Sequence, residues 1–305
     1  DDRYSSNRNW GPRVDPGLYL TYFDGVARPY VAVKNNIDGF FRTGINTSNS
    51  LIVNKKTGKT GLRVTYTDMR DKDLIPKTHM SRNTLNLRTN TNITKYVDLD
   101  FKVTYTRERV TNRPAVADHR ANVAKNLMTL STTFDQAWLK HNYEDAKGEY
   151  YNWNNGDVYN INPYWVLHKM TNESKKDNYK GSAILRYRPL KQLTLQATLG
   201  ADINYFTFEE FAYPTSPGHE RGWFERKNYQ NRMHTAELLA IYKDKYKKWD
   251  YGATLGGNIY KVDNETHIVT AQNMIMRSTK ALQSFTEKVN KEDTYRKQIN
   301  SLYGS

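Results

Sequence analysis

The feature that most constrains this chain is a regular alternation of apolar and polar residues. It is clearest in residues 97–106, where every second side chain is apolar and every intervening one is polar. Successive side chains of a β-strand point to opposite faces of a sheet, so this segment predicts a strand with one apolar and one polar face. The apolar residues are Val97, Leu99, Phe101, Val103 and Tyr105.

The alternating segments come in pairs that are joined in two different ways. Short turns close the predicted hairpins, and Gly58 and Pro189 suit such turns because glycine accepts positive φ and proline cannot donate to a ladder. Long connections separate one hairpin from the next. The hairpins are predicted at 47–68, 81–107, 178–207 and 229–262, and the long loops at 1–46, 108–177, 208–228 and 263–294.

An up-and-down sheet with all its long loops at one end is typical of outer-membrane β-barrels, which have short periplasmic turns and long extracellular loops. A β-sandwich would instead distribute its loops to both ends. We therefore predict an all-β fold, a transmembrane up-and-down antiparallel β-barrel, of which this chain forms a partial arc of about eight to nine strands. The long loops, including 1–46, would be extracellular, and residues 47–305 would form the barrel segment.

Composition leaves more than one class of protein open. No stretch approaches the ~18–20 apolar residues of a membrane helix, and the mean hydropathy is −0.86. A barrel wall tolerates so polar a chain because only every second residue faces lipid. A soluble or secreted β-rich module that binds glycans is the alternative, and a diffusive porin is a third interpretation that the long loops disfavour.

The net charge of +14 comes from basic residues that are scattered along the chain rather than gathered in an arm. We therefore expect no nucleic-acid partner, and we attribute the excess to solvated loops and to contact with acidic lipid head groups of the outer membrane. The chain contains no Cys, which excludes disulfides and thiol chemistry.

The residues give little support to enzyme chemistry or to a cofactor. None of the seven His residues has zinc-ligand spacing, so we expect no catalytic residues and no metal. The oxygen-rich stretch 144–157 leaves Ca²⁺ open, although it lacks an EF-hand pattern. Within the loop 108–177, apolar residues at helical spacing over 123–138 predict a short helix that packs its own loop, and 271–286 is a second helix candidate.

Aromatic residues in the loops are the best candidates for contacts with a substrate or a partner. Aromatic faces stack on sugars or on peptide side chains, and neighbouring amides bind hydroxyl or backbone groups. The alternative is that these rings hold the long loops together or lie in a membrane-interface girdle. The candidates are Tyr150, Tyr151, Trp153, Tyr164 and Trp165 in one cluster, Trp223 in a second, and Trp10 in the first loop.

Several strings in this order resemble the early barrel region of SusC/RagA-type TonB-dependent outer-membrane transporters, over nearly the whole chain. They are Trp10-Gly11-Pro12, Phe40-Phe41-Arg42-Thr43-Gly44, the stretch 59–67, Asn162-Pro163-Tyr164-Trp165 and Gly200-Ala201-Asp202. The resemblance implies a barrel of about 22 strands with an amino-terminal plug inside it. This chain would then begin within the first extracellular loop and supply strands two to nine and the start of the tenth.

The resemblance also implies a function and a set of partners. These transporters import glycans or oligopeptides across the outer membrane of Gram-negative cells, and a SusD-like surface lipoprotein docks on the long loops. Energy would arrive from TonB through the plug, a region that this sequence does not contain. An arc with two open edges cannot stay unpaired in lipid, so the remainder of the barrel and its plug are further expected partners. The sequence leaves open whether the cargo is glycan or peptide.

Overall fold

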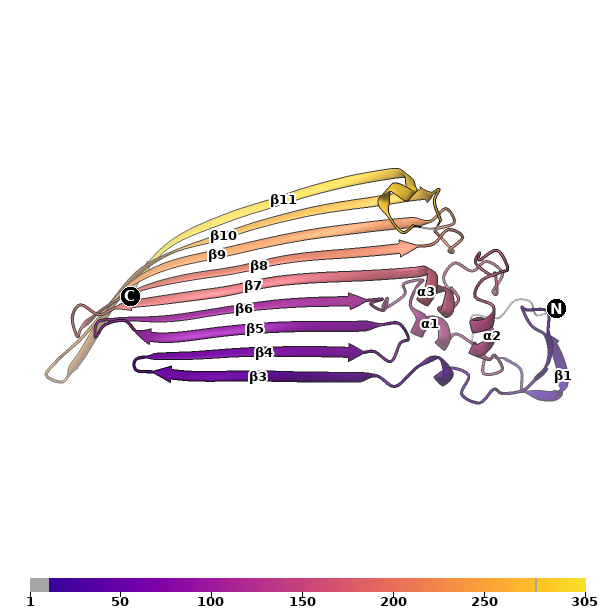
Figure 1. The fold of residues 1–305 in the computed structure, drawn as a ribbon, viewed down its shortest axis with the longest axis horizontal. Helices are drawn as coiled ribbons and strands as arrows, with labels where there is room; N and C mark the ends of the chain where they lie inside the picture. The colour runs from indigo at the N-terminus through magenta and orange to yellow at the C-terminus, as the bar shows by residue number, and fades with distance from the viewer. Residues whose placement is uncertain (1–10, 278) are drawn as a thin grey trace.

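The computed structural model describes residues 11–277 and 279–305. Its main element is a nine-stranded antiparallel sheet whose strands lie side by side in chain order (Figure 1). The predicted all-β, up-and-down architecture is confirmed, and within the described residues the sheet is open, with β3 and β11 at its edges. The strands are β3 (Ile45–Thr57), β4 (Thr60–Lys72), β5 (His79–Asn92), β6 (Val97–Thr111), β7 (Met170–Tyr187), β8 (Leu193–Ala212), β9 (Trp223–Tyr246), β10 (Trp249–Met274) and β11 (Phe285–Gly304).

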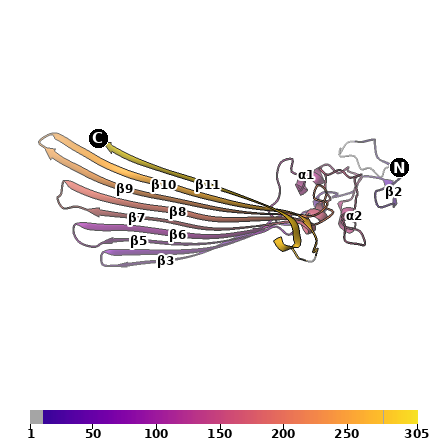
Figure 2. The same ribbon diagram turned by 90° about the horizontal axis from the view of Figure 1, so that it is seen from above.

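The short turns all lie at one end of the sheet and the long connections at the other (Figures 1 and 2). Gly58 has a φ of 55° in the turn between β3 and β4, the left-handed conformation expected there. Pro189 lies in the turn between β7 and β8, where no ladder hydrogen bond is lost.

The strands are longer than the alternation predicts, so the predicted loops between them are too long. The loop placed at 208–228 shrinks to 213–222, and the one placed at 263–294 shrinks to 275–284. β10 alone has 26 residues. In β10 the hydrogen-bonded ladder continues past the apolar part of the strand through Asn264, Glu265 and Thr266, where both faces are polar, and there the alternation no longer reveals a strand.

The remaining loops contain structure of their own. Residues 1–46, predicted as loop, include the hairpin of β1 (Asp15–Thr21) and β2 (Ala27–Tyr30) and the 3₁₀ turn η1 (Asp38–Phe40). The loop placed at 108–177 occupies 112–169, because β6 and β7 extend into the predicted range from both sides. It carries three short helices, α1 (Val123–Met128), α2 (Gln136–His141) and α3 (Pro163–Lys169).

The helix predicted over 123–138 is divided in two. Ser131 and Thr133 share a side-chain hydrogen bond, and the Ser131 hydroxyl accepts from the Thr133 amide, so this stretch competes with helix for its own backbone. Asp135 then caps α2 by accepting from the Ala137 amide at 2.8 Å. The second helix candidate, 271–286, is wrong, since its first part belongs to β10 and, among the described residues between β10 and β11, the one helical element is the 3₁₀ turn η2 (Leu282–Ser284).

The two faces of the sheet differ in chemistry along β4–β10. Cross-strand registry places the apolar residues of neighbouring strands in common rows, such as Leu87, Val103, Gly181 and Ala201. We call this the apolar face; the polar face carries Asp98, Asp100 and the residues in register with them. No second sheet covers the apolar face within the described residues, and Leu238 and Leu255 are 69% and 67% exposed.

Buried side chains gather instead at the loop end of the sheet. One cluster fills the long loops, and a smaller one lies where β8–β11 reach that end. The smaller cluster consists of Phe211, Phe224, Ala271, Met274 and Phe285.

No helix in the described part of the chain is long and apolar enough to cross a membrane.

Candidate functional site

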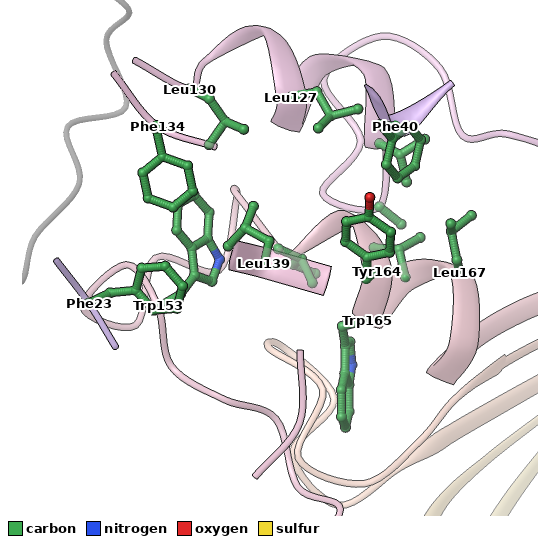
Figure 3. Close-up of a cluster of buried hydrophobic side chains, with 14 of the residues drawn as sticks. Phe23, Phe40, Leu127, Leu130, Phe134, Leu139, Trp153, Tyr164, Trp165 and Leu167 are labelled. Carbon is green, nitrogen blue, oxygen red and sulfur yellow. The ribbon is translucent and has the colours of Figure 1, made fainter. Parts of the chain in front are cut away.

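We call residues 11–44, 112–169 and 213–222 the loop assembly; it lies beyond the loop end of the sheet (Figures 1 and 2). Figure 3 shows its core, in which rings from the first and second loops meet. Phe23 stacks on Phe134 at 5.6 Å between ring centroids, and Phe40 meets Tyr164 edge-on at 5.3 Å. Segments about a hundred residues apart therefore fold into one hydrophobic unit.

Trp165 is the most enclosed ring of the predicted site. It is 0% exposed, and its Nε1 donates to Ser216 Oγ at 2.9 Å. Tyr150 and Tyr213 meet it edge-on, with centroids 5.3 and 6.2 Å away. The Lys169 ammonium lies 5.5 Å from the indole centroid. Trp165 thus ties α3 to the loop that joins β8 to β9.

Tyr164 and Tyr150 use their hydroxyls inside the same core. The Tyr164 hydroxyl bonds the amide oxygen of Gln136, and the Tyr150 hydroxyl accepts from the Asn162 amide at 3.2 Å. Burial raises the pKa of each tyrosine to about 12. Asn162 positions Tyr164 by capping α3, and Pro163 occupies the first helical position, where its missing N–H costs nothing. Both phenols stay neutral and act as structural hydrogen-bonding groups.

Trp153 and Tyr151 complete the cluster. Trp153 is 2% exposed and packs against Phe23 and Phe134, with centroids at 6.3 and 5.7 Å. Tyr151 is partly buried, and its hydroxyl donates to the Phe23 carbonyl at 3.3 Å. The buried rings of Trp153 and Trp165 leave no free face for a sugar or peptide, so their placement supports the alternative in which the rings hold the loops together.

The structure places the other two predicted residues apart from this cluster. Trp223 begins β9 on the polar face, opposite Ala212 and Gln272, and stacks on His219 at 5.0 Å. It is half-buried, so part of the ring remains open. Trp10 lies outside the described residues.

The loop assembly also has an exposed apolar surface, which the sequence analysis did not predict. In the hairpin of β1 and β2, Leu18 and Val26 are exposed and Tyr19 is 65% exposed. The hairpin lies at the end of the assembly farthest from the sheet (Figure 1). The pair Asp24-Gly25 was the available signal, since Gly25 forms the turn with a φ of 75°.

Arg28 anchors this hairpin to the core. Its guanidinium binds the Asp24 carboxylate at 2.6 Å and lies 4.1 Å from the centroid of Trp138. The hydrogen bond from Arg28 lowers the pKa of Asp24. A cation placed between a carboxylate and an aromatic face holds the turn in a defined orientation, so Tyr19 and its neighbours are presented on a fixed support.

The polar face of the sheet is crossed by ion pairs between adjacent strands. Arg88 binds Asp100 at 2.9 Å, and Lys180 binds Asp202 at 2.9 Å. Arg186 binds Asp98 at 3.1 Å and also donates to Gln196. These charges are partly exposed, and together they form a hydrophilic wall that runs toward the loop assembly.

In the stretch 144–157, for which the sequence did not decide on Ca²⁺ binding, carboxylate oxygens are engaged by protein groups. Glu144 binds Lys169 at 2.6 Å, and Asp145 accepts from the amides of Lys147 and Glu149. Across residues 11–277 and 279–305 there is no group of three or more His, Cys, Asp or Glu residues that could hold a metal ion.

Comparison with known proteins gives a fold but no family. No protein-family profile matches the chain, and no curated protein matches its sequence. Solved structures of the RagAB peptide transporter are similar to this chain. In one of them the aligned region includes 94% of this chain and 32% of the solved chain, at 14% sequence identity and a TM-score of 0.66. The RagAB peptide importer in its 'closed-closed' state covers 90% and 31%, at 14% identity and a TM-score of 0.66. For the importer in its 'open-open' state, the aligned region includes 88% of this chain and 30% of the solved chain, at 14% sequence identity and a TM-score of 0.65.

This chain therefore spans about a third of the length of the solved chains it matches. At 14% identity, the likeness shows that the fold is shared with chains of the RagAB peptide transporter structures.

Proposed function

We propose that this chain forms part of the barrel wall and the extracellular loops of a SusC/RagA-type outer-membrane importer. The single observation that carries the proposal is the contrast between the two faces of the sheet. One face exposes a continuous apolar surface and the other carries ion-paired charge, which suits a wall between lipid and a water-filled lumen. Transport, with no chemical step in this chain, is the proposed activity.

Tyrosines at the borders of the apolar face support its placement in a membrane. Tyr105, Tyr179 and Tyr205 follow one border, with centroids 4.8 and 6.4 Å apart. Tyr187 and Tyr242 lie toward the other border. Tyr179 and Tyr187 are eight residues apart on β7, roughly 26 Å along the strand at about 3.3 Å per residue. At the strand tilt of about 40° usual in such barrels, this corresponds to roughly 20 Å along the membrane normal, within an apolar band about 25 Å tall.

We propose oligopeptides or glycans as the cargo, and the RagAB peptide importers with the same fold favour peptides. TonB would supply energy through the plug of the complete protein. The candidate cargo contacts are on the polar face, where Trp223 is half-buried and lies on the same strand face as the ion pair of Glu225 and Lys227.

A SusD-like lipoprotein is the proposed partner of the loop assembly. The hairpin of β1 and β2 offers it exposed apolar side chains on a fixed support. Aromatic anchors of this kind commonly dominate binding energy at protein interfaces.

The experiment is co-purification of the lipoprotein with the tagged full-length protein from membranes. Replacing Leu18 and Tyr19 together with serine should reduce the retained lipoprotein about tenfold or more. Tyr159→Ser, at another exposed tyrosine of the loop assembly, is the matched control. Undiminished retention in the double variant would reject the hairpin as the docking surface.

The alternative function, a soluble glycan-binding module, predicts a protein that stays monodisperse without detergent. The uncovered apolar face argues against it. Full-length protein that remains in the aqueous phase after membrane fractionation would favour this alternative over the importer.

A further inference from the structure

The apolar face contains a hollow for which the proposed function gives no role. Its volume is about 540 Å³, and small side chains from three neighbouring strands form its floor. Phe101 of β6 and Ile259 of β10 flank it on either side. Small residues between large ones leave a space that the side chains of this chain do not fill. The floor consists of Gly181, Ala183, Ala201 and Ala236.

Two groups that can carry positive charge stand at one rim of the hollow. His234 is in register with Ala201 on one side and with Lys261 on the other, so both basic side chains project from the same face as the small residues. Both are exposed. Lys261 lies 3.6 Å from Asp263, but that carboxylate also binds Arg296 at 2.9 Å. One acid shared between two cations leaves positive charge at the rim.

The rim also marks where the apolar face ends on β9 and β10. Toward the short turns, the outward positions next to it are Ala236 and Ile259; toward the loops, they are Arg232 and Asp263. In the proposed membrane orientation, His234 and Lys261 therefore stand at the level of the lipid head groups. Gly181 and Ala201 lie in the same cross-strand row, and Ala183 and Ala236 lie one row deeper in the hydrocarbon.

We propose that this hollow binds one anionic membrane lipid, with an acyl chain over Gly181, Ala201 and Ala236 and the head-group phosphate at Lys261 and His234. The acyl chain fills the hollow, and the phosphate accepts charge-assisted hydrogen bonds from the basic side chains. The inference rests on the proposed exposure of this face to lipid. It adds a specific lipid, held by named residues, to the general lipid contact of a barrel wall.

The test reconstitutes the full-length protein in bilayers with equal amounts of phosphatidylglycerol and phosphatidylcholine. Native mass spectrometry then identifies the lipids that remain bound after detergent extraction. The unaltered protein should retain one phosphatidylglycerol in preference to phosphatidylcholine. Lys261→Gln should lower that preference about tenfold, the value of one hydrogen bond to a charged group. Ala201→Leu should fill the hollow and abolish retention of either lipid.

Matched controls separate the hollow from general effects. Lys288→Gln removes an outward-facing charge far from the hollow, and Ala253→Leu enlarges a small outward-facing residue of β10 that does not line it. Both should retain lipid like the unaltered protein. Equal retention of the two lipids by the unaltered protein, or unchanged retention in Ala201→Leu, would overturn the proposal.

The outcome also distinguishes this inference from the proposed function. A protein that inserts into bilayers and binds its lipoprotein, yet holds no lipid preferentially, refutes the lipid site alone. A protein that fails to insert overturns both.

Discussion

Replacing Trp165 with alanine should loosen the loop assembly and leave the sheet intact. The indole is fully enclosed and donates to Ser216, which is itself buried. Truncating a buried tryptophan typically costs about 3–5 kcal/mol, a range that includes the cavity and the hydrogen bond left unmade. Because the contacts of Trp165 lie within the loop assembly, the loss should fall on local opening there.

Backbone hydrogen exchange of the full-length protein in detergent measures this directly. A loss of about 3–5 kcal/mol accelerates exchange through local opening by roughly a hundred- to several-thousand-fold, since each 1.4 kcal/mol is a factor of ten. The acceleration should appear in α2, α3 and the segment between them. Amides of the β9–β10 ladder should exchange at their original rate, because the ladder carries its own hydrogen bonds.

Two further variants identify the cause. Trp165→Phe keeps a ring but loses the Nε1 donor, and should give a smaller effect of about 1–2 kcal/mol. Tyr159→Ala removes an aromatic side chain of the same segment; this side chain is 59% exposed. The free energy of local opening should therefore change by less than about 0.5 kcal/mol. If Trp165→Ala left exchange unchanged while cargo or lipoprotein binding fell, the ring would be a direct contact and the structural role assigned to it would be refuted.

Two other predictions test the hairpin anchor and the membrane orientation. Because Arg28 lowers the pKa of Asp24, their pairing should stabilise the hairpin fully above the ordinary carboxyl pKa of 3.8 and be lost as the pH falls through the lower folded value. Exchange protection of the hairpin should therefore fall in acid in the unaltered protein and be low at every pH in Arg28→Ala; equal protection in the two proteins would contradict this. Leu238→Arg places a charge on the apolar face and should cost about 2–4 kcal/mol in a bilayer, whereas Leu239→Arg, one residue away on the polar face, should cost much less. Similar unfolding free energies for the two variants in lipid would refute the assignment of the faces.

The sequence predicts those parts of the sheet where one face is apolar. Residues 97–106 and 193–201 show their alternation because the environments on the two sides of the strand differ. Farther along β10, Asn264, Glu265 and Thr266 pair with both neighbouring strands, yet all three are polar. A ladder made by backbone groups between two polar faces has no hydrophobic period, so these extensions look like loop in the sequence.

The candidate site was predictable in composition but not in orientation. The cluster from Tyr150 to Trp165 contains rings that pack the loops together, which is one of the two interpretations given for it in the sequence analysis. Which way each ring points depends on long-range contacts, such as the hydrogen bond from the Tyr22 hydroxyl to the Thr133 carbonyl, 111 residues away. Local pattern carries no information about such a pairing, and it also left the exposed hairpin of β1 and β2 unrecognised.

The burial of these rings changes where recognition must take place. Trp153 and Trp165 gain their packing energy from the loop core, and a ligand could reach them only by opening it, at a cost of several kcal/mol. Side chains of the polar face and of the hairpin of β1 and β2 are already accessible, so a ligand can contact them without opening the loop core. For the importer proposed above, the polar face below the assembly would therefore contact the cargo and the hairpin above it the lipoprotein, with a packed core between them that neither contact disturbs.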